Sequence, residues 1–178
     1  MNSTTNALAE LALAAPEFDP ENPPELSPEL VAQHLAEGKP LKDLLGIGDG
    51  VWEAMYDFGW RNFQNAQFEA AEFWWTQTSL FDSGRERNWI ALGVACKKQQ
   101  KWEQALNAFS MAAHHGSKNP WVPLHAAECL LQLSRIQRAK QALETADTWI
   151  QGHSDAVIIA KRIAMLRRGI QRRDVNAL

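Results

Sequence analysis

The sequence predicts an all-α protein built from repeated helix pairs, and two observations support this fold class. Proline occurs six times between positions 16 and 40 and afterwards only at Pro120 and Pro123, so long stretches lack a residue that breaks a helix. From Val51 onward, residues of similar size recur every 34 positions. A period of 34 residues is the sequence signature of the tetratricopeptide repeat, in which each repeat is a pair of antiparallel helices.

Small and bulky residues set the register of the repeats. They recur in three series, two small and one bulky: Gly59, Gly93 and Ala127; Ala71, Ala105 and Ala139; Trp75, Phe109 and Leu143. We expect the two small series to lie on facing helices, where close approach excludes large side chains, and the bulky series to fill the wider ends. Together with the glycines that fall between repeats, this register predicts repeats over 51–84, 85–118 and 119–152.

Two further helical segments are expected to flank the repeats. Ser27 and Pro28 are a typical N-cap and first helical residue, and Gly38 is a typical helix end. They predict a helix over 28–37, which a connector follows within an N-terminal segment of residues 27–50. A last helix over 154–172, within the C-terminal segment 153–178, is expected to cover the end of the array. Its predicted apolar face consists of Val157, Ile158, Ile163, Leu166 and Ile170. The predicted fold is a tetratricopeptide superhelix of three repeats with an N-terminal helix and a C-terminal capping helix.

The first 26 residues are expected to form a disordered acidic leader. They combine the proline cluster with acidic and small polar residues and bury too little apolar surface to fold. They also lack the basic and apolar regions of a secretory signal, and the chain has no apolar run near the ~20 residues that span a bilayer. With only two cysteines, Cys96 and Cys129, which we expect in the core, the sequence predicts a soluble protein of a reducing cytoplasm.

Composition and motifs argue against several classes of function. The formal net charge of -3 does not suit a nucleic-acid-binding surface. There is no glycine-rich phosphate loop, no His-Glu-x-x-His pair and no Cys-x-x-Cys, and the five histidines fall on different predicted elements. The sequence therefore predicts no catalytic residue, no metal site and no cofactor.

The first helix of each repeat carries the candidate binding residues, because in such arrays this helix lines the concave surface. Residues at i, i+4 and i+7 share a helix face, and in the first repeat Met55, Phe58 and Gly59 are expected to form the packing stripe. The remaining face and its equivalents in the later repeats are Tyr56, Trp60 and Phe63; Ile90, Val94 and Lys97; and Leu124, Glu128 and Leu131. An apolar groove with a few polar groups suits an extended peptide. The alternative is that a neighbouring helix or the leader covers this stripe.

A second apolar surface is expected outside the groove. Helix 28–37 exposes an apolar edge of Leu30, Val31 and Leu35, and Trp74 and Phe81 share an outer face of the following helix pair. Either these two surfaces pack together within one chain or they form the interface of a homodimer.

The ends of the chain differ in charge. Residues 1–39 carry seven acidic residues and one lysine, whereas the last helix carries a basic cluster of Lys161, Arg162, Arg167, Arg168, Arg172 and Arg173. This cluster is either a solvated face or a contact for an acidic partner or the acidic leader.

Three segments resemble a known family. They are Leu41–Ile47, Phe68–Glu72 and especially Pro120–Gln132, with the pattern Pro-x-x-Pro-x-His-Ala-Ala-Glu-Cys. Over residues 28–150 the chain is similar to the class II chaperones of bacterial type III secretion, the tetratricopeptide chaperones of translocator proteins. The resemblance implies a protein without catalysis that holds hydrophobic translocators in the cytoplasm and forms a homodimer without its client. It also implies that Tyr56, Trp60, Phe63 and Phe68 grip a short extended client segment of the Pro-x-Leu-x-x-Pro kind.

One alternative function remains open from the sequence. A general tetratricopeptide scaffold would join two soluble proteins through its convex face. Copurification separates the two hypotheses, because a chaperone solubilises a membrane-inserting client whereas a scaffold copurifies with soluble partners.

Overall fold

The computed structural model describes residues 26–176, and in this range it contains nine α-helices and no strand. The all-α fold is therefore confirmed. The leader expected over residues 1–26 lies, except for Leu26, outside the described residues. The chain divides into two compact units, residues 1–88 and residues 89–178.

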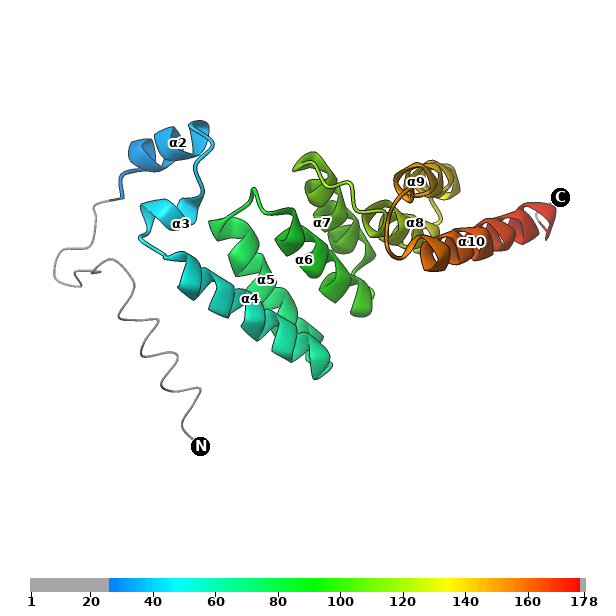
Figure 1. Cartoon of the computed structure of the whole chain (residues 1–178), viewed down its shortest axis with the longest axis horizontal. Helices are drawn as coiled ribbons and strands as arrows, with labels where there is room; N and C mark the ends of the chain where they lie inside the picture. The colour runs from blue at the N-terminus through cyan, green and yellow to red at the C-terminus, as the bar shows by residue number, and fades with distance from the viewer. Residues whose placement is uncertain (1–25, 177–178) are drawn as a thin grey trace. The chain divides into compact units, whose positions relative to one another are not determined.

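The first unit holds the N-terminal helices and the first repeat. Helix α2 (Pro28–Ala36) is followed by α3 (Leu41–Leu44), α4 (Asp49–Gln64) and α5 (Phe68–Phe81). Helices α4 and α5 form the antiparallel pair expected for repeat one (Figure 1). The Ser27 hydroxyl accepts a hydrogen bond from the Leu30 amide at 3.2 Å, which is the predicted N-cap of α2.

Helix α3 was not expected from the sequence, which predicts only a connector there. It packs against both α2 and α5. The Lys42 side chain in α3 is buried, and its ammonium lies 2.9 Å from Asp43 Oδ1 and 3.1 Å from Asp49 Oδ1. These carboxylates compensate the charge that packing removes from water, so α3 links the connector to the start of α4.

A glycine sets the contact between the two helices of repeat one. A Cβ placed on Gly59 would lie 2.4 Å from Trp75 Nε1, closer than side chains tolerate. The missing side chain lets the buried Trp75 indole lie against the backbone of α4, where its Nε1 donates a hydrogen bond to the Tyr56 carbonyl at 3.2 Å. The close helix contact expected at Gly59 is present, but the expectation that bulky residues lie only at the wider ends was wrong, because the missing side chain of Gly59 makes room for the Trp75 ring.

The second unit holds most of repeat two, repeat three and the last helix. Helix α6 (Glu86–Lys98) begins at the end of the first unit and continues into the second. It is followed by α7 (Trp102–His114), α8 (Trp121–Gln132), α9 (Ile136–Trp149) and α10 (Ala156–Asn176). One core cluster joins α6, α7 and α8 around Phe109, and another joins α8, α9 and α10 around Leu143.

Repeat two has the same helix contact as repeat one. A Cβ on Gly93 would lie 2.6 Å from Phe109 Cε1.

The cysteines behave as expected for core residues, since Cys96 and Cys129 are both buried and free. Burial raises the pKa of the Cys129 thiol to about 11.

The apolar face of α10 differs in part from the prediction. Ile163 and Ile170 are buried as expected, but Val157 and Ile158 are 67% and 60% exposed, and Ile159 is buried instead. The prediction of those two residues was wrong because the buried face follows helical spacing from Ile159 to Ile163, Leu166 and Ile170, which places residues 157 and 158 toward solvent.

The turn inside each repeat shares an unusual backbone conformation. Ala66, Gln100 and Ser134 follow one another at the repeat period and have φ angles of 59°, 60° and 57°. The next amide in each case bonds back into the preceding helix, as in Arg135 N to Leu130 O at 2.8 Å. This arrangement is a Schellman-type helix end at a position that glycine normally occupies.

No helix in the described range is both long and apolar enough to cross a membrane.

Candidate functional site

The first candidate site is an aromatic cluster around Trp75 in the first unit. The rings of Tyr56 and Phe63 lie 6.0 Å and 5.6 Å from the Trp75 ring, measured between centroids. Phe68 meets Phe63 edge-on at 5.3 Å, and Trp60 stacks on Phe63 at 6.2 Å. The structure therefore brings the four aromatic residues of the predicted site together.

These rings do not share one environment. Trp60 is 48% exposed, whereas Tyr56, Phe63 and Phe68 are half-buried. The expectation that the Tyr56–Trp60–Phe63 stripe lies outside the intra-repeat packing was wrong for Tyr56 and Phe63. The reason is Gly59, which lets Trp75 approach α4 so closely that the ring reaches residues one turn away on either side. Burial also raises the pKa of Tyr56.

The apolar surface of α5 differs from the prediction as well. Trp74 is half-buried and stacks on Phe58 of α4 at 5.3 Å, and Phe81 is also half-buried. Instead, Phe73 and Leu80 are 57% and 58% exposed. On α2, Leu30 and Leu35 are exposed as expected, at 41% and 51%, while Val31 is half-buried.

In the second unit, the predicted groove residues separate into core and surface positions. Leu124 is fully buried and packs with Leu143 and Ile159, so its assignment to an open groove was wrong. The cause is α10, which covers this side of α8. Ile90 and Val94 are half-buried against the core around Phe109.

Lys97 and Glu128 form the centre of a polar network. The Lys97 ammonium donates a hydrogen bond to Glu128 Oε2, and the Arg162 guanidinium binds Glu128 Oε1 at 2.7 Å. Lys97 Nζ also lies 2.8 Å from His125 Nδ1. Glu128 thus accepts from two cations that come from α6 and α10.

The surroundings of the network shift the pKa values of two of its groups. Burial raises the pKa of the Glu128 carboxyl, but the contacts from His125, Lys97 and Arg162 outweigh it and hold this pKa far below its usual range. Burial lowers the pKa of His125, so the imidazole is neutral near pH 7. The network therefore carries one carboxylate and two cations at neutral pH.

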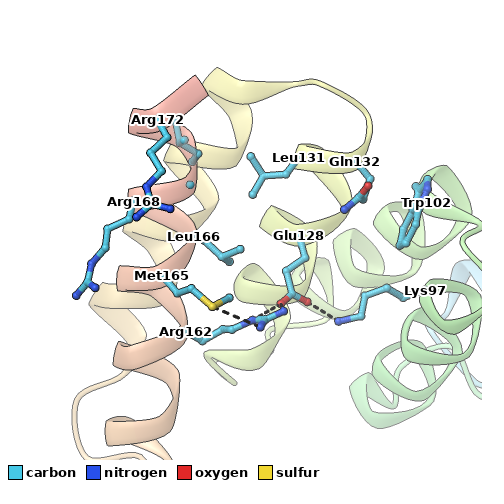
Figure 2. Close-up of a pocket in the computed structure, with 12 residues that line it drawn as sticks. Lys97, Trp102, Glu128, Leu131, Gln132, Arg162, Met165, Leu166, Arg168 and Arg172 are labelled. Atoms are coloured by element: carbon cyan, nitrogen blue, oxygen red, sulfur yellow. Dashed lines mark hydrogen bonds and ion pairs between the residues drawn. The ribbon is translucent and has the colours of Figure 1, made fainter. Parts of the chain in front are cut away.

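A cavity of about 640 Å³ opens beside the network (Figure 2). Its lining comes from α6, α7, α8 and α10 and includes the predicted site residues Lys97, Glu128 and Leu131. Leu131 from α8 and Leu166 from α10 project into it, and Trp102 lies at another side (Figure 2). The cavity combines apolar and charged lining, the combination that is typical of ligand-binding sites.

The α10 half of this site was not predicted, although the sequence contains its signal. Arg162 lies one period of 34 residues after Glu128, and Trp121 Nε1 donates to Asp155 Oδ2, again 34 residues later. Helix α10 therefore continues the register of the first helix of a repeat. Extending the period beyond the third repeat would have placed Arg162 next to Glu128.

Among the described side chains, no group of three or more histidine, cysteine, aspartate or glutamate residues is arranged to hold a metal ion.

Comparison with known proteins supports the repeat assignment. Residues 97–160 match the model of the tetratricopeptide repeat family. Low calcium response locus protein H of Yersinia pestis is 24% identical over 125 residues, which cover 70% of this chain and 74% of that protein.

Two solved structures share the fold. A type III secretion complex from Aeromonas hydrophila matches with a TM-score of 0.76 at 20% identity, over 82% of this chain and 97% of that chain. The Yersinia enterocolitica type III secretion chaperone SycD, in complex with a peptide of the translocator YopD, matches with a TM-score of 0.68 at 23% identity, over 72% of this chain and 98% of that chain. The tetratricopeptide fold predicted from the sequence is confirmed.

Proposed function

We propose that this chain, a homologue of the type III secretion chaperones such as SycD, is itself a chaperone that binds an extended segment of a hydrophobic translocator protein. It acts in the bacterial cytoplasm and keeps the translocator soluble and competent for secretion. Low calcium response locus protein H and SycD come from Yersinia species, and the SycD complex contains a translocator peptide.

The exposed indole of Trp60 carries this proposal. Half of this large aromatic side chain is open to water, so a partner that covers it gains the free energy of burying that apolar area. Phe63 stacks on the Trp60 ring and restricts its orientation. Phe63 in turn packs on Trp75 and Phe68. The core of repeat one thus presents a fixed aromatic anchor, and a rigid anchor loses little conformational entropy when a peptide binds.

The proposed client contacts lie in both units. They are Tyr56, Trp60, Phe63 and Phe68 in the first unit, and Ile90, Val94, Lys97, Glu128 and Leu131 in the second. Tyr56 and Phe63 act mainly by supporting Trp60. The exposed Leu30 and Leu35 support a homodimer in the absence of client as part of the same proposal.

Co-expression with a translocator from the same genome tests the function. We expect the chain to keep that translocator in the soluble fraction and to copurify with it. Trp60→Ala should weaken binding of the client segment about tenfold, since an aromatic ring removed from water contributes on the order of 1.5–3 kcal/mol. Circular dichroism should remain helical, because the Trp60 ring is not part of the core.

Phe73→Ala is the matched control. Phe73 is a ring of comparable exposure, at 57%, but it lies on α5. Its removal should leave client binding unchanged. A Trp60→Ala protein that folds and binds the translocator as the wild type does would refute the proposed site, and copurification with soluble proteins alone would refute the function.

A further inference from the structure

The cavity between α8 and α10 has a lining that divides into two parts. Leu131, Leu166 and Ile170 supply apolar lining, and Arg162, Arg168 and Arg172 of α10 supply charged lining. Its volume of about 640 Å³ lies within the range of sites that enclose a small ligand. A side chain of leucine size, together with its flanking backbone, matches these dimensions.

The charges of the cavity are unbalanced. Arg162 is engaged with Glu128, and Arg167, which lies outside the cavity, pairs with Asp147 at 3.1 Å. Arg168 and Arg172 have no carboxylate within ion-pair distance among the residues that the structure describes. The one carboxylate in the lining, Glu128, is already bound by Lys97 and Arg162. Both arginines are exposed, so an acidic ligand in the cavity would bring carboxylates to two cations that have no ion pair among the described side chains.

Gly169 is the second unusual feature of this wall. It lies inside α10, where glycine destabilises a helix by roughly 0.5–1 kcal/mol relative to alanine. Its conformation is ordinary, and a Cβ built on it would meet no atom within 4 Å. Neither backbone geometry nor packing in this chain explains the glycine. A ligand that approaches the α10 backbone at the cavity wall would explain it.

We infer that this cavity binds an acidic peptide segment in which a leucine-type side chain is flanked by carboxylates. The apolar side chain enters between Leu131 and Leu166, the carboxylates pair with Arg168 and Arg172, and the peptide backbone passes over Gly169. The inference rests on the proposed function, since it takes the occupant to be part of the client. The apolar interior favours a peptide over a nucleic acid, whose phosphates would engage only the arginines.

Filling the cavity tests the site. Gly169→Leu places a large side chain at its wall, and Gly169→Ala adds only a methyl group to the same helix position. Both variants should melt at the wild-type temperature or higher, because each replaces a helical glycine. The probe is a labelled synthetic peptide, Gly-Glu-Glu-Leu-Glu-Glu-Gly. Gly169→Leu should abolish its binding and Gly169→Ala should weaken it far less.

Charge tests the second half of the inference. The peptide with glutamates should bind about fivefold more tightly than the same peptide with glutamines at low salt, and added salt should reduce this difference. Arg168→Gln with Arg172→Gln should remove the preference. Arg138→Gln with Lys161→Gln removes the same charge from exposed positions elsewhere in the unit and should preserve it.

Several outcomes would overturn the inference. The first is that neither peptide binds at millimolar concentration, as judged from spectra of the ¹⁵N-labelled protein. The second is that both peptides bind with equal affinity. The third is that the arginine double variant and its control double variant change binding equally. Tighter binding of a uridine oligonucleotide at Arg168 and Arg172 would also overturn it. If the wild-type protein solubilises the translocator but does not bind the peptide, only this inference fails. If the peptide binds and no translocator is solubilised, the proposed function fails instead.

Discussion

The first and third repeats share one register but carry different chemistry on the same helix face. Trp60 in the first repeat and Glu128 in the third occupy equivalent positions, two periods apart. The Trp60 ring is half-exposed and rests on Phe63, whereas Glu128 is held by Lys97 and Arg162. The repeat register therefore determines the position of a side chain on the helix but not the groups that it contacts.

What the repeats do share is a pairing of sizes between their two helices. Glycine faces a large ring in repeats one and two, as Gly93 faces Phe109, while Ala127 and the smaller Leu143 meet in the core of repeat three. An added methyl group on one helix is thus accompanied by a smaller residue on the other. This compensation keeps the helices of each pair close at nearly constant packed volume.

The largest expected effect comes from breaking this pairing. Gly93→Leu should destabilise the protein by about 3 kcal/mol or more, because even its Cβ would lie within 2.6 Å of the Phe109 ring. Urea unfolding followed by circular dichroism measures the loss. An unchanged midpoint would contradict the repeat register.

The matched control transfers the repeat-three pair into repeat two. Gly93→Ala combined with Phe109→Leu should be more stable than the sum of the two single effects by about 1 kcal/mol. The smaller leucine makes room for the added methyl group, and the methyl group fills part of the space that the ring leaves. Simple additivity would show that the two positions do not share one packed volume.

The next effect concerns the charged position of repeat three. Glu128→Gln should cost about 2 kcal/mol at pH 7, less than the loss expected for a fully buried pair, because Arg162 is exposed and regains water. Thermal unfolding gives the measurement. Glu144→Gln on the exposed side of α9 is the control and should change the stability little.

The pH dependence has a definite sign. The pKa of Glu128 is lower in the folded state than the ordinary value of 4.5, so its stabilisation is lost as pH falls below 4.5. The pKa of His125 is also lowered, from 6.5, so the unfolded state binds more protons below pH 6.5 and stability declines there too. Glu128→Gln should remove the first loss and retain the second. A variant whose stability still falls below pH 4.5 as steeply as the wild type would assign this loss to other carboxyl groups.

Most of the fold could be predicted because it depends on size and period. Gly59 and Gly93, like Trp75 and Phe109, recur at one spacing that sets the repeat register, but the contact of each glycine with a ring was seen only in the structure. Helix α3 was not predicted because four residues carry no periodic signal, and it forms where the chain packs against α2 and α5.

The site was harder to predict because exposure depends on tertiary contacts. Helical spacing places Tyr56 and Trp60 on one face, but it cannot tell that Trp75 reaches Tyr56 and leaves Trp60 open. In the same way, Leu124 has the pattern of a groove residue until α10 covers it. The cavity arginines were recognised as a basic cluster, and only the fold brings them beside Leu131.

The smallest expected effect tests whether the turns have the same backbone conformation in the different repeats. Ser134 and Ala66 hold positive φ angles that cost a side-chain-bearing residue about 1–2 kcal/mol and a glycine almost nothing. Part of that gain is lost because glycine makes the unfolded chain more flexible, so Ser134→Gly and Ala66→Gly should each stabilise by about 0.5 kcal/mol. Ala160→Gly, at an exposed site inside α10, should destabilise by about 1 kcal/mol. Equal gains in the free energy of unfolding at both turns would show that the repeats share this turn conformation. A loss for Ser134→Gly as large as that for Ala160→Gly would show that the turn at Ser134 is not held in the left-handed conformation.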